Sequence, residues 1–87
     1  MKIKDGFVAR EVGGETIVIT VGERSKSFNA MITLNETGKF LWERMGEETD
    51  VEKLTAALLE EYDVDEETAR GAVERFAASL EKAGLLA

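Results

Sequence analysis

The chain of 87 residues contains no cysteine, no histidine and no proline. Without cysteine there is no disulfide, no thiolate nucleophile and no cysteine-held zinc or iron–sulfur cluster. Without histidine the chain lacks the usual near-neutral general base and the commonest metal ligand. No phosphate-binding loop or dinucleotide motif is present either. We therefore expect no catalytic residue, no metal site and no cofactor.

Long hydrophobic runs are also absent. No segment approaches the ~18 consecutive apolar residues that a membrane-spanning helix needs, and residues 1–5 lack the apolar core of a signal peptide. The expectation is a cytoplasmic protein without membrane contact. With 44% hydrophobic and 33% charged residues, the composition is normal for a globular chain. Because 87 residues leave room for one modest core, residues 1–87 are expected to form a single domain.

Basic residues are scarce, with 11 against 18 acidic residues and a net charge of −7. Residues 1–33 hold five basic and four acidic side chains, whereas residues 34–87 hold six and fourteen. A helix that reads DNA gains affinity from Lys and Arg beside the phosphates. The acidic second part therefore argues against nucleic acid as a partner. A winged-helix DNA-binding regulator stays open as an alternative function.

The first third of the chain is predicted to form strands. Residues 7–12 alternate in part, and Gly13-Gly14 after them is a two-residue hairpin signal because glycine adopts positive φ freely. Residues 16–21 are all Thr, Ile or Val, which favours a strand. Residues 27–32 alternate between apolar and mostly polar positions. Three strands with short connections are typical of an antiparallel meander.

The third of these strands, residues 27–32, is predicted to lie at an edge of the sheet. It carries no charge, so it lacks the charged residues that usually protect an edge. Either a helix or the C-terminal residues 85–87 cover this edge, or it pairs with a strand from another chain. The alternation places Phe28, Ala30 and Ile32 on one face and Ser27, Asn29 and Met31 on the other.

The first two helices are predicted from their N-caps. The first begins with Asn35 or Thr33, both acceptable N-caps, and ends near Gly46. The second begins with a capping box in which Thr49 is the N-cap and Glu52 reaches back to it.

The third helix is predicted to begin at the N-cap Asp65 and to end at Gly84. Gly71 lies in its interior, where glycine costs up to about 1 kcal/mol relative to alanine. Core packing does not explain Gly71, because it projects away from the apolar stripe. The element order predicts an α+β, winged helix-turn-helix-like fold with a three-stranded antiparallel sheet followed by three helices. The apolar stripe consists of Ala69, Val73, Phe76, Leu80 and Ala83.

Several segments carry a family resemblance. The most specific is the spacing of Leu34, Asn35, Gly38 and Trp42. Together with the supporting segments it resembles the PqqD family, the stand-alone peptide-recognition elements of ribosomal peptide modification, over residues 6–87. The supporting segments are residues 28–38, 40–42, 50–54, 60–65 and 80–86.

The resemblance implies a non-catalytic peptide chaperone. Family members bind the leader of a precursor peptide and present the peptide to a modifying enzyme, often a radical-SAM protein. The leader adds as an antiparallel strand to the third strand and lies against the third helix. Residues 30–33, Ala-Met-Ile-Thr, stand where the branch that makes pyrroloquinoline quinone (PQQ) has an aromatic-rich stretch. We therefore expect a precursor peptide of another pathway.

The predicted peptide-binding site joins the third strand to the third helix. Arg70 is expected to pair with a leader carboxylate, and the small Ala77 to leave room for a leader side chain. Val73 and Leu80 are either contact residues or core residues, and the sequence leaves both open. The predicted site residues are Ser27, Phe28, Asn29, Ala30, Met31, Ile32, Arg70, Val73, Ala77 and Leu80.

Two further alternatives stay open. The other flank of the third helix, with Thr68, Ala72 and Ser79, is a second candidate for the face that meets the peptide. The edge strand is also a candidate for pairing with its own copy, which would make the protein a homodimeric scaffold or oligomerisation domain.

Overall fold

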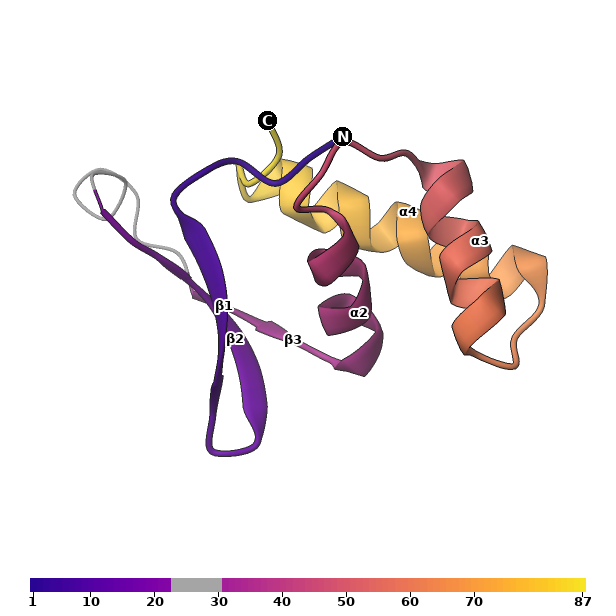
Figure 1. The fold of residues 1–87 in the computed structure, drawn as a ribbon, viewed down its shortest axis with the longest axis horizontal. Coiled ribbons are helices and arrows are strands. Elements are labelled where there is room, and N and C mark those ends of the chain that lie inside the picture. Colours follow the sequence, from indigo (N-terminus) through magenta and orange to yellow (C-terminus); the bar gives the residue numbers. More distant parts are fainter. Residues whose placement is uncertain (23–30) are drawn as a thin grey trace.

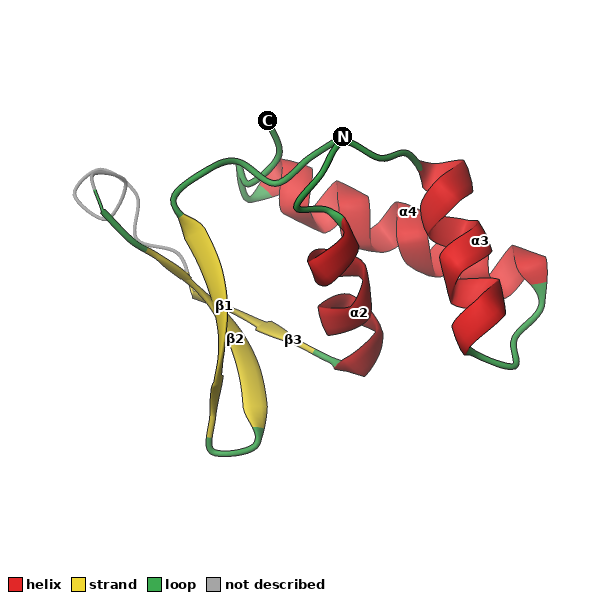
Figure 2. Ribbon diagram, in the orientation of Figure 1, coloured by secondary structure: helices red, strands yellow, loops and turns green. Residues whose placement is uncertain are grey.

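The computed structural model describes residues 1–22 and 31–87 (Figure 1). It contains a three-stranded antiparallel sheet followed by three helices, and this confirms the predicted α+β architecture. In Figure 2 the helices gather on one side of the strands. The elements are β1 (Phe7–Val12), β2 (Glu15–Thr20), β3 (Met31–Leu34), α2 (Glu36–Arg44), α3 (Val51–Glu61) and α4 (Glu66–Lys82).

A tight turn at Gly13-Gly14 joins β1 to β2. Both glycines have positive φ, +59° and +85°, and Val12 lies opposite Glu15 as the closing pair. The predicted hairpin is therefore confirmed. At the other end of the hairpin, the amide of Val21 donates to the carbonyl of Gly6 at 2.9 Å. These two ends define which residue pairs exchange hydrogen bonds along the ladder, because such pairs alternate in an antiparallel sheet.

β3 extends two residues further along the chain than the sequence pattern predicts. The predicted strand covers residues 27–32, whereas β3 covers Met31–Leu34; residues 27–30 lie outside the described part. Opposite β2, Ile32 pairs with Val18. Ile32 packs against the core and Leu34 is buried, so the face predicted for Ile32 is correct and continues through Leu34. β2 also begins one residue earlier than predicted.

The C-terminal residues pair with the N-terminal segment. Ile3 and Leu86 form an isolated antiparallel bridge. The amide of Lys4 donates to Leu85 and that of Ala87 donates to Lys2, both at 2.8 Å. Figure 1 shows the two ends of the chain side by side. The alternative in which residues 85–87 cover the third strand is therefore wrong.

One core joins the sheet to all three helices. The α4 stripe supplies Ala69, Val73 and Leu80, all 1% exposed, which confirms the predicted periodicity at these positions. In the described part of the chain, no helix is long and apolar enough to cross a bilayer. The buried apolar residues are Ile3, Phe7, Val18, Leu34, Leu41, Met45, Leu54, Leu58, Ala69, Val73, Leu80 and Leu85.

Asparagine and aspartate side chains begin α2 and α4. The Asn35 side chain accepts a hydrogen bond from the amide of Gly38 at 2.7 Å. The Asp65 side chain accepts from the amide of Thr68 at 2.9 Å. Both caps are confirmed, and of the two predicted N-caps of the first helix Asn35, not Thr33, has this role.

The predicted capping box of α3 is wrong by one residue. Asp50, not Thr49, is the N-cap, and its side chain accepts from the amide of Lys53 at 2.8 Å. Glu52 does not reach back to the cap, because its carboxylate binds Arg70 of α4. A charge-assisted pair with a guanidinium is stronger than a bond to a neutral amide, which explains the choice.

Thr55 of α3 provides a test of the packing. It is 2% exposed, and its hydroxyl has no hydrogen-bond partner among the described residues. A buried polar group without a partner costs about 1–3 kcal/mol. We predict that Thr55→Val, which keeps the shape, raises the free energy of unfolding by about 1 kcal/mol in urea denaturation. The control Thr55→Ser keeps the hydroxyl, loses a methyl group and is expected to be less stable than the parent. A Val variant less stable than the parent would contradict this packing.

Candidate functional site

β3 is the last strand of the sheet, in the order β1-β2-β3, so one of its sides has no strand neighbour in the described structure. The alternation set by the hairpin directs the backbone groups of Ile32 and Leu34 toward β2. The N–H and C=O groups of Met31 and Thr33 then point to the open side. These are the groups with which a further strand pairs.

Beside this edge lies a groove between β3 and α4, which we call the β3–α4 groove. Its first part, about 330 Å³, lies between residues 32–35 on one side and Phe76 and Ser79 on the other. Its second part, about 340 Å³, lies between the first turn of α2 and the α4 residues Ala72, Arg75 and Phe76. Asn35, Gly38 and Phe76 line both parts, so the two parts lie next to each other along α4.

Three of the four residues with the family-like spacing, Leu34, Asn35 and Gly38, line this groove, whereas Trp42 lines the cavity between β1 and α2. Leu34 is buried and Asn35 caps α2 through the amide of Gly38. A Cβ atom at Gly38 would lie 3.3 Å from the Phe76 ring and 3.1 Å from the Asn35 Oδ1 atom. Glycine at this position therefore lets α4 approach the first turn of α2 closely. The Leu-Asn-x-x-Gly spacing has a packing reason that the sequence alone does not reveal.

The predicted site residues of the strand lie partly at the open edge. Met31 and Ile32 belong to β3, and Ile32 lines the β3–α4 groove. Ser27, Phe28, Asn29 and Ala30 lie outside the described residues.

The predicted site residues of α4 do not line the groove. Val73 and Leu80 are 1% exposed and belong to the core, so they offer no surface to a peptide in this structure. Ala77 is half-buried and lines neither part of the groove. Of the alternative flank, Ala72 and Ser79 line the groove.

Two groove residues of α4, Arg75 and Phe76, are in neither of the two predicted sets for that helix. Phe76 was assigned only to the apolar stripe, although it lies at the edge of that stripe and is half-buried. Arg75 has no acidic residue three or four positions away on its helix, in contrast to Arg70. The sequence spacing therefore leaves Arg75 without an acidic partner on its own helix.

Arg70 connects α4 to α3 rather than to the groove. Its guanidinium donates to both carboxylate oxygens of Glu52, at 2.5 and 3.0 Å, and lies 3.5 Å from Glu66. These bonds hold the pKa of Glu52 below its ordinary value and raise that of Arg70. A bidentate pair of this kind fixes the guanidinium in one place, so Arg70 is already occupied.

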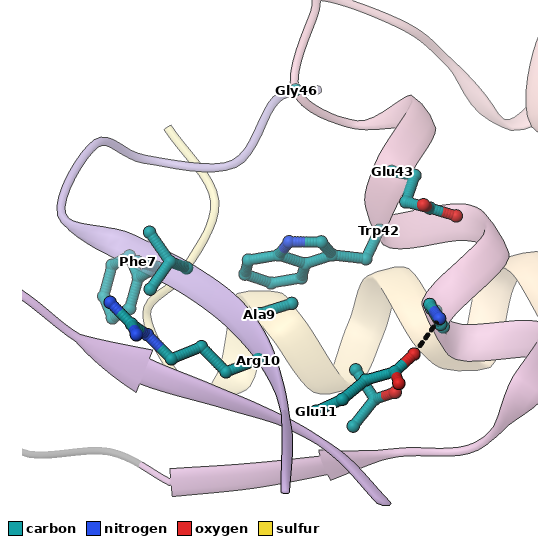
Figure 3. A pocket seen from close by; sticks show the side chains of 10 residues that line it. Phe7, Ala9, Arg10, Glu11, Trp42, Glu43 and Gly46 are labelled. Atoms are coloured by element: carbon teal, nitrogen blue, oxygen red, sulfur yellow. Dashed lines mark hydrogen bonds and ion pairs between the residues drawn. The ribbon is translucent and has the colours of Figure 1, made fainter. Parts of the chain in front are cut away.

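A second cavity of about 550 Å³ lies between β1 and α2 (Figure 3). The Trp42 indole points across it toward Ala9, next to Phe7. Lys39 donates to Glu11 at 2.5 Å on its border, which lowers the pKa of the Glu11 carboxyl. Its lining contains two basic and two acidic side chains, so its charges balance. Within residues 1–22 and 31–87, no group of three or more acidic side chains is placed to hold a metal ion.

Comparisons with known proteins find two similarities. The family model described as coenzyme PQQ synthesis protein D (PqqD) matches residues 15–86. Among solved structures, the chain described as TbiB1 in complex with the TbiA(beta) leader peptide is 24% identical, with a TM-score of 0.77. The alignment covers 99% of this chain and 94% of that one, so the two share their fold over nearly their whole lengths. A comparison with curated proteins finds no match.

The pair between Glu52 and Arg70 predicts a pH dependence of stability. Because the folded-state pKa of Glu52 is below its ordinary 4.5, its stabilising contribution is present above pH 4.5 and is lost as the pH falls through the lowered pKa. We predict that Glu52→Gln lowers stability at pH 7 and reduces the drop between pH 7 and pH 3. Urea denaturation at both pH values measures this.

The matched control is Glu60→Gln, an exposed glutamate on the same helix without an ion pair among the described residues. It is expected to leave the pH dependence close to that of the parent protein. If Glu52→Gln retains the full drop between pH 7 and pH 3, the pair does not contribute to acid sensitivity.

Proposed function

The chain belongs to the PqqD family, and we propose that it binds the leader of a ribosomally synthesised precursor peptide as an added strand on β3. The observation that carries this proposal is the open β3 edge beside the β3–α4 groove. The solved structure of TbiB1, which shares this fold, is described as a complex with a leader peptide. An edge and an adjoining groove are the two features that strand addition needs.

The geometry gives each part of the site a separate task. The outward N–H and C=O groups of Met31 and Thr33 supply main-chain pairing, which does not depend on the peptide sequence. In an extended peptide, every second side chain points to the same face, and one such set enters the groove. There it meets the Phe76 ring and the apolar side of Ile32. Selectivity for a particular leader therefore resides in the groove.

The chemistry itself is proposed to belong to a separate modifying enzyme, of the radical-SAM class in many systems of this kind. The chain has no cysteine or histidine with which to perform it, and its task is presentation. Residues 34–87, with fourteen acidic and six basic side chains, are proposed to steer an enzyme surface of positive charge.

We further propose that the precursor is not that of PQQ. The family description refers to PQQ synthesis, but residues 30–33, Ala-Met-Ile-Thr, lack the aromatic side chains expected of that branch. The PqqD fold would then serve a different peptide here.

The ion pairs that Arg70 of α4 makes favour peptide binding over DNA binding. Arg70 is paired with Glu52 and Glu66, so the helix that would enter a groove of DNA has one available basic side chain fewer. Pairing of β3 with a second copy would use the same edge as the peptide. Sedimentation velocity without peptide detects such a dimer, and the proposal expects a monomer in which the edge is available.

A display library made from short reading frames of the source genome, cut into 30-residue fragments, tests the proposed function. Fragments captured by the full chain are titrated into ¹⁵N-labelled protein. We expect amide shifts to concentrate in β3 and in residues 72–79 of α4. A tightly bound fragment that leaves both segments unshifted would overturn strand addition at this edge.

The pairing pattern predicts opposite behaviour of two proline variants. Thr33→Pro removes an N–H that points to the open side, so the sheet is expected to remain intact while leader binding weakens roughly tenfold. Ile32→Pro removes an N–H that points to β2, so the protein itself is expected to lose stability. Thermal denaturation and fluorescence anisotropy measure the two effects. Unchanged binding by a folded Thr33→Pro variant would show that the leader does not pair with this strand.

A further inference from the structure

Among the described residues, the charge in the β3–α4 groove comes from Arg75. Of the described residues that line its two parts, all are apolar or neutral polar except Arg75. No carboxylate of residues 1–22 or 31–87 lines the groove beside this cation. The groove is therefore locally positive in a chain whose net charge is −7.

Arg75 has no ion-pair partner within residues 1–22 and 31–87. The other arginine near the middle of α4, Arg70, is paired with Glu52 and Glu66. The positions three and four residues from Arg75 are Gly71, Ala72, Ala78 and Ser79, none of which can pair with it. Arg75 is an exposed residue, so an incoming anion can reach its side chain.

Gly71 gives the Arg75 side chain its position. A Cβ atom at Gly71 would lie 3.1 Å from Nη1 of Arg75, so the guanidinium lies back over the glycine along the helix surface. With alanine at this position the Nη1 atom would have to move by a few tenths of an ångström, so the contact gives this interior glycine, which costs helix stability, a role outside the core. The absent side chain leaves space for the guanidinium beside the groove.

We propose that Arg75 selects one acidic residue in the bound peptide. The proposal rests on the proposed function and deepens it, because it states which peptides the groove accepts. A carboxylate is the side chain that a guanidinium binds best, through two parallel hydrogen bonds. The neutral polar side chains of Asn35 and Thr37, which line the same part of the groove, do not compete for the cation.

The position of Arg75 predicts where the acidic residue lies in the peptide. Arg75 lines the part of the groove beyond the C-terminal end of β3, together with Thr37. A strand that adds antiparallel to β3 has its N-terminal end there. The acidic residue therefore precedes the apolar residue that packs on Phe76. Because both side chains enter the groove, they are an even number of positions apart.

The contact selects a position and not an acidic peptide in general. A chain with a net charge of −7 repels an acidic peptide at distances beyond direct contact. Only a carboxylate close to Arg75 gains from it. We expect the remaining residues of the selected peptides to be neutral or basic.

An mRNA-displayed library of random 12-residue peptides, selected on the immobilised full chain, tests the proposal. Peptides bound by the parent protein are expected to contain one Asp or Glu at an even spacing before an apolar residue. Arg75→Gln should lose this preference, and Arg75→Glu should prefer Lys or Arg at the same position. Arg70→Gln, the matched control on the same helix, should keep the preference of the parent.

The affinity for one selected peptide measures how much Arg75 contributes to binding. Arg75→Gln is expected to weaken it roughly 3- to 10-fold, between the values for an exposed ion pair and for a hydrogen bond to a charged group. Replacing the peptide's acidic residue by its amide should weaken binding to the parent equally and to Arg75→Gln very little.

The outcomes separate this proposal from the proposed function. The role of Arg75 is overturned if the selected peptides shift the β3 amides but have no preferred position for Asp or Glu. It is also overturned if peptides selected on Arg75→Gln keep that preference. Either result leaves strand addition standing. Selected peptides that shift neither β3 nor α4 overturn both.

Gly71→Ala provides a second variant in which folding is not at risk. Alanine favours the helix, so the urea midpoint is expected to rise, while the displaced guanidinium lowers peptide affinity severalfold. Stability and affinity then change in opposite directions. An affinity that is unchanged or improved in the more stable variant would overturn the positioning of Arg75 by Gly71.

Discussion

The two-residue turn at Gly13-Gly14 fixes the register of the sheet, and the β3 edge proposed to bind a peptide depends on that register. With Val12 opposite Glu15, each residue of β2 has a defined face and a defined hydrogen-bonding side. A slip by one residue would turn Val18 out of the core and would direct the Thr33 amide toward β2. The free edge would then present a different set of backbone groups. A turn distant from the groove in sequence therefore decides which groups β3 offers.

α4 contacts three neighbouring parts of the fold. Its central stripe, represented by Val73, is buried in the core. Arg70 on one side binds α3 through Glu52, and the flank with Phe76 faces β3 and the start of α2. The same burial that stabilises the fold thus holds one wall of the groove rigid. Gly38 completes the arrangement, because it lets α2 approach Phe76 closely.

Much of the fold could be predicted from the sequence where local chemistry decides it. The strand at residues 7–12, its glycine turn, and the caps Asn35 and Asp65 are confirmed. The α3 cap is an error of one residue. Thr49 and Asp50 are both good caps, and the deciding contact of Glu52 lies on another helix. A capping motif read along the chain does not contain that contact.

The site was less predictable because it depends on how elements pack. Alternation alone places a strand at residues 27–32, but pairing with β2 carries it on through Thr33 and Leu34. On α4, successive residues are about 100° apart, so the pattern identifies the buried stripe and not the flank that meets β3. Ala72 and Ser79 line the groove, whereas Ala77 does not. The family resemblance pointed to the third strand and the third helix, and the structure shows which flank of α4 lines a groove beside β3.

Amide hydrogen exchange of Thr33, measured by NMR with and without a saturating bound leader, tests the central claim most directly. Strand addition predicts that exchange at Thr33 slows at least about tenfold, as expected when a free amide enters a ladder hydrogen bond. Ile32 and Leu34, already bonded to β2, should change little. If the Thr33 amide exchanges at its free rate in the saturated complex, the leader does not pair with β3 and the account is contradicted.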